Sequence, residues 1–203
     1  MNSSLYLALG DSLTKGYGVG TRNSFATLYY NEISKVYPDL EYINAGVNGI
    51  KSGELANLVR KPEYIRCIAC SRIITLTIGS NDLLAIGKGL LTGTAVNIDQ
   101  ILRNLNRNLM AIANNIRLIN SHAIIKIATI YNPLSRSNPQ VRHLSYKLIR
   151  AVNMCIERIA KQFQMIVVPI DKAFWKREDM FLGEHLHPNI IGYRVMAEMF
   201  LTC

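Results

Sequence analysis

The sequence predicts an α/β fold, a three-layer α/β/α sandwich in which helices cover both faces of a mostly parallel, five-stranded sheet. Five short apolar runs alternate with helical patterns, which is typical of parallel strands joined by right-handed crossover helices. In addition, 49% of the 203 residues are apolar and only 18% are charged. This composition excludes intrinsic disorder and favours a well-buried sheet.

Each predicted strand is a short run rich in apolar or β-branched residues. The predicted strands cover residues 5–10, 41–44, 72–78, 123–130 and 165–170. None of these runs approaches the ~18 apolar residues that a membrane-spanning helix needs. We therefore expect no transmembrane segment.

Helical periodicity fills the intervals between the strands. The predicted helices cover residues 24–37, 52–59, 95–120, 141–163 and 189–200. Pro38 ends the first helix, and Ser52 is expected to cap the second. Because no internal repeat or low-complexity linker divides the chain, we expect residues 1–203 to form a single domain.

Lysine and arginine outnumber aspartate and glutamate by 23 to 14, which gives a net charge of +9. Such a charge attracts nucleic acid or anionic lipid. The cations are spread along the chain, without a basic run or an RNA-binding aromatic signature. We expect no nucleic-acid partner, and attraction to anionic surfaces stays open. The first residues lack the basic region of a signal peptide, which predicts a cytoplasmic protein unless the N-terminus was trimmed.

The cysteines give no sign of a metal site. Cys67 and Cys70 form a single C-x-x-C that directly precedes a predicted strand. A structural zinc usually needs four ligands, and no second pair follows. A redox pair would instead lie between a strand and the helix after it. We expect two half-buried free thiols.

Polar and glycine-rich segments follow each predicted strand. In parallel sheets, ligands bind beyond the carboxyl ends of the strands. The segments that fall there are residues 10–13, 46–49, 79–82, 131–133 and 185–188. The sequence therefore predicts a site on one rim of the sheet, built from five loops.

These loops carry the groups that acyl transfer requires, namely a nucleophile, a base with its orienting group, and donors for the oxyanion. Ser12 lies at a strand-to-helix turn and is a nucleophile or a helix cap. Gly49 has no Cβ and can donate its N–H at close range, or it is an ordinary turn glycine. Asn81 offers a side-chain amide or forms an Asx turn. His187 is the candidate base, and Glu184 can accept from its ring. The set, in this order, favours an acyl-transfer site.

The same segments resemble the sequence blocks of the SGNH (GDSL) family of serine esterases and lipases. Residues 10–13, Gly-Asp-Ser-Leu, are similar to the first block, residues 44–49 to the second and residues 79–82 to the third. His187-Pro188 resembles the fifth, so the resemblance spans residues 10–193. It implies a flavodoxin-like fold and ester hydrolysis without a metal or an organic cofactor.

The resemblance also implies roles for individual residues. Ser12 would be the nucleophile and His187 the general base. The backbone N–H groups of Ser12 and Gly49 and the side chain of Asn81 would form the oxyanion hole. The two aspartates next to these residues, Asp11 and Asp82, would hold the loops in place.

One position departs from the family pattern. The family has D-x-x-H-P in its fifth block, and this chain has Glu184 in place of the aspartate. Triads with glutamate occur, so Glu184 is expected to orient His187. If it does not reach, Asp179 or a backbone carbonyl takes that part. His185 is a rival base only if the register shifts by two residues.

Apolar residues close to the blocks predict the acyl pocket. The candidates are Leu13, Leu83, Leu84, Ile86, Tyr131, Pro133, Leu134 and Leu186. They favour short to medium acyl esters or lysophospholipid-type esters, with a carbohydrate O-acetyl esterase as the alternative. A catalytically silent lipid- or glycan-binding module is a hypothesis of another class, which the substitution at Glu184 supports. A neutral histidine base predicts activity that rises with pH near ~6.5.

Overall fold

A computed structural model describes residues 4–91, 95–135, 137–183 and 186–203. Its centre is a five-stranded parallel sheet with the strand order β2-β1-β3-β4-β5. The strands are β1 (Leu5–Gly10), β2 (Glu41–Gly46), β3 (Ser71–Thr77), β4 (Ile124–Ala128) and β5 (Ile166–Val168). The predicted fold class, a parallel sheet of five strands between helices, is confirmed.

Helices connect every pair of consecutive strands. They are α1 (Ser12–Lys15), the 3₁₀ helix η1 (Thr21–Asn23), α2 (Phe25–Ile33), α3 (Ser52–Leu58), α4 (Pro62–Ala69), α5 (Ser80–Leu91), α6 (Ile98–Ile119), α7 (Pro139–Gln162), α8 (Ile170–Phe174), α9 (Glu178–Phe181) and α10 (Ile190–Thr202).

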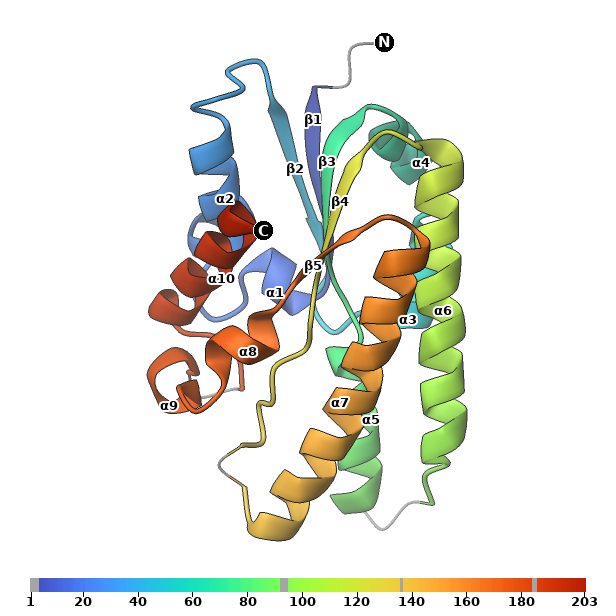
Figure 1. The fold of residues 1–203 in the computed structure, drawn as a ribbon, viewed down its shortest axis with the longest axis vertical. Coiled ribbons are helices and arrows are strands. Elements are labelled where there is room, and N and C mark those ends of the chain that lie inside the picture. Colours follow the sequence, from blue (N-terminus) through green and yellow to red (C-terminus); the bar gives the residue numbers. More distant parts are fainter. Residues whose placement is uncertain (1–3, 92–94, 136, 184–185) are drawn as a thin grey trace.

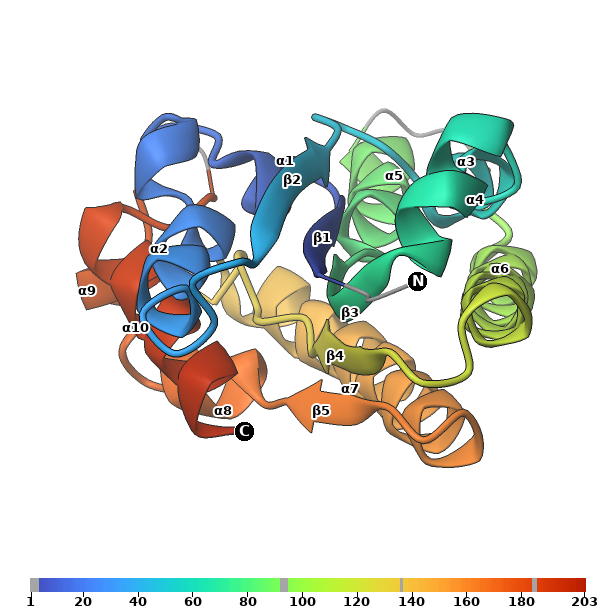
Figure 2. The ribbon, with the colours of Figure 1, turned by 90° about the horizontal axis from the view of Figure 1, so that it is seen from above.

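Two hydrophobic cores lie on opposite faces of the sheet, as the layers in Figures 1 and 2 show. Helices α3, α4, α6 and α7 bury one face against the sheet, while α2, α8 and α10 bury the other. Every residue of β1 is buried. The sequence of this central strand is an uninterrupted apolar run because helices cover both faces of the sheet there.

The ends of several elements differ from the sequence prediction. The N-cap of α3 is Lys51, and Ser52 is the first helical residue instead of the expected cap. The hydroxyl of Ser52 donates to Asp82 at 2.8 Å, so a neighbouring helix takes the hydrogen bond that a cap would have made. Cys67 is half-buried, as expected, whereas Cys70 is exposed at the end of α4; both thiols are free.

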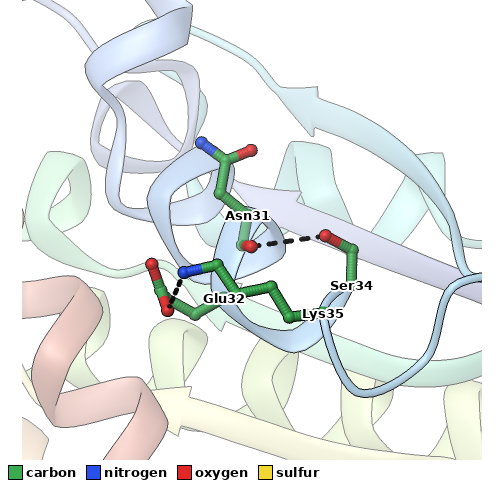
Figure 3. A network of polar contacts seen from close by, with 4 residues as sticks. All are labelled: Asn31, Glu32, Ser34 and Lys35. Carbon is green, nitrogen blue, oxygen red and sulfur yellow. Dashed lines mark hydrogen bonds and ion pairs between the residues drawn. The ribbon is translucent and has the colours of Figure 1, made fainter.

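The end of α2 is held by local polar contacts, which Figure 3 shows. Lys35 forms an ion pair with Glu32 at 2.6 Å, and the hydroxyl of Ser34 donates to the carbonyl of Asn31 at 3.3 Å. Helix α2 ends at Ile33, four residues earlier than predicted, before the turn that leads into β2. An exposed pair of this kind stabilises a protein by less than about 1 kcal/mol.

The parallel arrangement brings the carboxyl ends of all five strands to one edge of the sheet. In Figure 1 β1 runs downward, and α1 follows at the lower end of that strand. The loops with the candidate site residues follow these carboxyl ends. In the part of the chain that the structure describes, no helix is long and apolar enough to cross a membrane.

Candidate active site

The central feature of the site is a hydrogen bond between two residues from opposite ends of the chain. Ser12 Oγ lies 2.8 Å from His187 Nε2. Ser12 is the first residue of α1, and His187 precedes α10 by three positions. A hydroxyl paired with an imidazole at this distance can pass its proton to the ring when the oxygen attacks an electrophile.

The turn that presents Ser12 depends on a glycine at the end of β1. Gly10 has a φ of +151°, and a Cβ there would come within 2.4 Å of Thr77 Oγ1 and 2.5 Å of the Thr77 carbonyl oxygen. Only glycine allows β1 to approach the end of β3 this closely. The N–H of Asp11 then donates to the Thr77 carbonyl at 3.0 Å, which fixes the first residue after the strand.

Asp11 caps α1 from a fully buried position. Its Oδ1 accepts from the Leu13 N–H at 3.0 Å and from the Thr77 hydroxyl at 2.9 Å. Its Oδ2 has no hydrogen-bond partner among the described residues. Burial raises the pKa of Asp11 to about 6, because desolvation outweighs these two hydrogen bonds. Asp11 thus fixes the turn beside Ser12 without reaching solvent.

The loop that carries His187 is closed by backbone contacts. The Gly183 N–H donates to the His187 carbonyl at 2.7 Å, and Leu182 pairs with Pro188 in an antiparallel bridge. Within this loop Leu186 has a φ of +63°, a conformation that costs energy for a residue other than glycine. Glu184 and His185 lie outside the described residues, as does the side chain of Asp179.

Tyr131 supports the strained residue next to His187. Its hydroxyl donates to the Leu186 carbonyl at 2.9 Å, and its ring packs 4.9 Å from that of Phe174. Burial raises the pKa of Tyr131 well above its ordinary value, so the phenol keeps its proton and remains a donor. We expected this residue to line the acyl pocket. The structure instead buries it beneath the loop.

A second tyrosine packs directly on the candidate base. The ring of Tyr17 lies 4.6 Å from the ring of His187, at an interplanar angle of 39°. The hydroxyl of Tyr193 donates to the Tyr17 carbonyl at 3.1 Å and holds this segment against α10. A tyrosine ring in this position also stabilises the imidazolium that forms when the histidine takes up a proton.

The third part of the site joins the ends of β2 and β3. Asp82 is buried and accepts from the Ser52 N–H at 3.0 Å, in addition to the hydroxyl already described. Asn81 Nδ2 donates to the Ile50 carbonyl at 2.9 Å. Gly49 has a φ of +76°, and a Cβ there would meet no atom within 4 Å. The loop containing Gly49 is thus fixed beside Asn81, with open space over the glycine.

A groove of about 510 Å³ opens beside His187. Its lining is mostly apolar and comes from the segment after α1 and from the start of α10: Tyr17, Gly18, Val19, Gly183, His187, Pro188, Asn189, Ile190 and Ile191. None of the residues expected to form the acyl pocket lines this groove. Leu13 is buried, Leu83 and Pro133 are half-buried, and Leu186 is exposed. The sequence signal for the groove was the apolar Ile190-Ile191 pair, which follows His187-Pro188 after one intervening residue.

The described residues do not bring three or more histidine, cysteine, aspartate or glutamate side chains together as metal ligands. The site presents several chemical groups of its own. These are a hydroxyl bonded to an imidazole, a buried carboxylate under the turn, and an amide and a glycine on the facing loop. This set suits nucleophilic attack on a carbonyl.

Comparison with known proteins gives matches over most of the chain. Residues 8–195 match the family model described as the GDSL-like Lipase/Acylhydrolase family. The spore germination lipase LipC of Bacillus licheniformis is 24% identical over 204 residues, which cover 95% of this chain and 92% of LipC.

Solved structures share the fold. The lipase Lip_vut3 from a goat rumen metagenome superposes with a TM-score of 0.85 at 23% identity, covering 98% of this chain and 96% of the lipase. A variant of Axe2, an acetyl-xylooligosaccharide esterase from Geobacillus, superposes with a TM-score of 0.72 at 17% identity. It covers 100% of this chain and 95% of the esterase.

Proposed function

Because this chain belongs to the GDSL-like lipase/acylhydrolase family and is a carboxylic ester hydrolase, we propose that Ser12 is its nucleophile and His187 its general base. The observation that carries the proposal is the 2.8 Å contact between Ser12 Oγ and His187 Nε2. His187 takes the serine proton as Oγ attacks the ester carbonyl, and then protonates the leaving alcohol. Water hydrolyses the acyl-enzyme with His187 again as base.

We propose that three hydrogen-bond donors stabilise the negative charge that develops on the carbonyl oxygen of the ester. They are the backbone N–H groups of Ser12 and Gly49 and the side-chain amide of Asn81. An amide nitrogen has two N–H groups, and Asn81 uses one of them on Ile50. The other is available to an oxyanion. The open space over Gly49 supports close approach of the substrate to that loop.

We assign the orientation of the imidazole to Glu184, three residues before His187. A carboxylate that accepts from Nδ1–H selects the tautomer in which Nε2 can act as a base. Tyr131 and Tyr17 assist by fixing the loop and the ring, through the hydrogen bond to Leu186 and the ring contact described above.

We further propose that the substrate is an ester with an apolar part, of short to medium acyl length or of lysophospholipid type. The mostly apolar groove beside His187 supports this, since Tyr17, Val19, Ile190 and Ile191 line it. A purely hydrophilic ester would leave these side chains in contact with water and gain little from them.

The test is hydrolysis of p-nitrophenyl acetate, butyrate and octanoate, together with an acetylated xylooligosaccharide. We expect turnover by the wild type, with octanoate or butyrate preferred to acetate. Ser12→Ala is expected to lower kcat by about 10⁴-fold or more, Glu184→Gln by up to about 10⁴-fold, and Asn81→Ala by about 10²–10³-fold.

The matched controls are Ser34→Ala, at the half-buried serine that follows the last residue of α2, and His185→Gln beside Glu184. Both should retain activity. If Ser34→Ala and Ser12→Ala lose activity equally, Ser12 is not the nucleophile. Preference for the acetylated oligosaccharide would show a carbohydrate O-acetyl esterase instead. A folded wild type that turns over none of these esters would indicate a binding module.

A further inference from the structure

Six large apolar side chains are exposed next to the catalytic centre. Each of them leaves between 37% and 54% of its surface accessible. We call them the apolar rim: Tyr17, Val47, Leu84, Leu186, Ile190 and Ile191. Single exposed apolar residues are ordinary, but a cluster of them marks a surface that is covered by something else.

The rim surrounds the site from several sides. Tyr17, Ile190 and Ile191 line the groove that opens at His187. The Val47 N–H donates to the carbonyl of Gly10, two residues before Ser12, at 2.9 Å. Leu186 precedes His187, and Leu84 lies one turn along α5 from Asn81. The rim therefore belongs to the end of the molecule at which the strands terminate.

Exposed cations accompany the rim. A Cβ on Gly46 would lie 2.4 Å from the backbone nitrogen of Lys15, so Lys15 lies beside the end of β2 and next to Val47. Lys51 follows the Gly49 loop, and Arg22 lies on η1, three residues after the groove residue Val19. All three cations are exposed.

Two of the aspartates at this end, Asp11 and Asp82, are buried and contribute no exposed carboxylate. The exposed acid Glu54 accepts the backbone N–H of Lys51 at 2.8 Å. The whole chain also carries a positive net charge, +9, which has the same sign as these exposed cations. The end of the molecule around the site thus combines apolar side chains with cations.

We propose that the apolar rim docks on an anionic lipid surface, and that the site draws its ester from the lipid of that surface. Apolar side chains enter the boundary between headgroups and acyl chains, while lysine and arginine remain at the level of the phosphates. An anionic lipid surface is complementary both to the exposed apolar side chains and to the cations beside them. The second part of this inference rests on the proposed function, because it names the substrate class of the same site.

The test measures binding without hydrolysis, with Ser12→Ala protein sedimented with vesicles. We expect binding to phosphatidylglycerol vesicles, weaker binding at high salt, and little binding to phosphatidylcholine vesicles. Replacing Ile190 and Ile191 together by serine is expected to lower the partition coefficient by about ten-fold or more. The matched control replaces two exposed apolar residues away from the site, Val36 in the turn after α2 and Leu118 in the last turn of α6, and should change the partition coefficient little.

Two double variants test whether the cations next to the rim contribute to lipid binding. Lys15→Gln with Lys51→Gln is expected to weaken binding by roughly five-fold per residue. Lys35→Gln with Lys161→Gln removes the same charge from the opposite end and should have a smaller effect. Equal losses from both pairs would show unoriented attraction by the net charge and overturn the proposal. So would no binding at low salt, or equal binding to both lipids.

These outcomes are separable from failure of the proposed function. A protein that hydrolyses soluble p-nitrophenyl esters and does not bind vesicles refutes the docking surface alone. A protein that binds through the rim, with a wild type that hydrolyses no ester, refutes the catalytic assignment alone.

Discussion

Asp11 is a buried carboxylate directly beside Ser12, the proposed nucleophile, and its environment makes the stability of the fold depend on pH. One oxygen accepts two hydrogen bonds, and the other has no partner among the described residues. Burial raises the pKa of Asp11 from 3.8 to about 6. The folded state therefore holds this proton more tightly than the unfolded chain does, which makes the contribution to stability largest at acidic pH.

The stabilising contribution of the Asp11 proton is fully present below pH ~4 and is lost as the pH rises through about 6. Asp11→Asn has no proton to lose. We expect the free energy of unfolding of Asp11→Asn, relative to the wild type, to rise by up to ~3 kcal/mol between pH 4 and pH 8. Urea denaturation across this range measures the difference. Asp39→Asn, at an exposed acid, is the control, and a difference that is constant with pH would contradict the expectation.

At the scale of secondary-structure elements, the start of α10 determines where His187 lies. Asn189 caps the helix by accepting the Gly192 N–H at 2.9 Å, and its Nδ2 donates to the Met180 carbonyl at 2.9 Å. Gly192 itself packs against the chain on the other side of the histidine loop. A Cβ there would lie 2.4 Å from the Phe181 carbonyl oxygen and 2.9 Å from Pro188 Cβ.

Gly192→Ala is therefore expected to push α10 away from Phe181 and to displace the loop between them. Overpacking of this kind costs about 1–3 kcal/mol of stability, and an ångström of misplacement at His187 lowers kcat by about 10²-fold. Thermal denaturation and p-nitrophenyl butyrate hydrolysis measure the two effects. Gly87→Ala is the control, because a Cβ at Gly87 in α5 meets no atom within 4 Å. It should stabilise the protein by about 0.5–1 kcal/mol. Equal behaviour of the two variants would contradict the packing argument.

At the scale of the whole molecule, the two cores share one sheet, and we propose that they unfold together as a single domain. Trp175 is the only tryptophan of the chain and follows α8, on the side of the core that α8 helps to form. Its ring lies 5.0 Å from that of Tyr146 on α7, which packs into the other core. A tryptophan signal therefore reports on contact between the two helical layers.

We expect urea unfolding followed by tryptophan fluorescence to coincide with unfolding followed by far-ultraviolet circular dichroism. The circular dichroism is dominated by the long helices α6 and α7, whereas the fluorescence reports on α8. Coincident transitions indicate one cooperative unit. Midpoints that differ between the two probes would show that the two faces of the sheet unfold separately. Trp175→Phe, followed by circular dichroism alone, serves to check that the probe itself does not alter the transition.

Much of this architecture could be predicted because a buried parallel strand is a continuous apolar run, and β1 begins and ends at the predicted residues. Helices α4 and α5 were not predicted. In α4 only Ile68 is buried, and α5 begins inside the Gly-Ser-Asn-Asp segment, which reads as a loop. The proximity of Ser12 and His187 followed from motif order. The support that Tyr131 gives to Leu186 depends on tertiary contacts between distant segments, which local pattern does not encode.

The contact between Ser12 and His187 spans 175 positions of the chain. On a ribosome that adds about 5–20 residues per second, Ser12, the proposed nucleophile, is made roughly 9–35 s before His187, its proposed base. Under the proposed assignment, the nascent chain lacks the base of its catalytic pair while most of the sheet is synthesised. Ester hydrolysis then begins only when the segment that carries His187 packs against the strands made first, so the activity depends on completed folding.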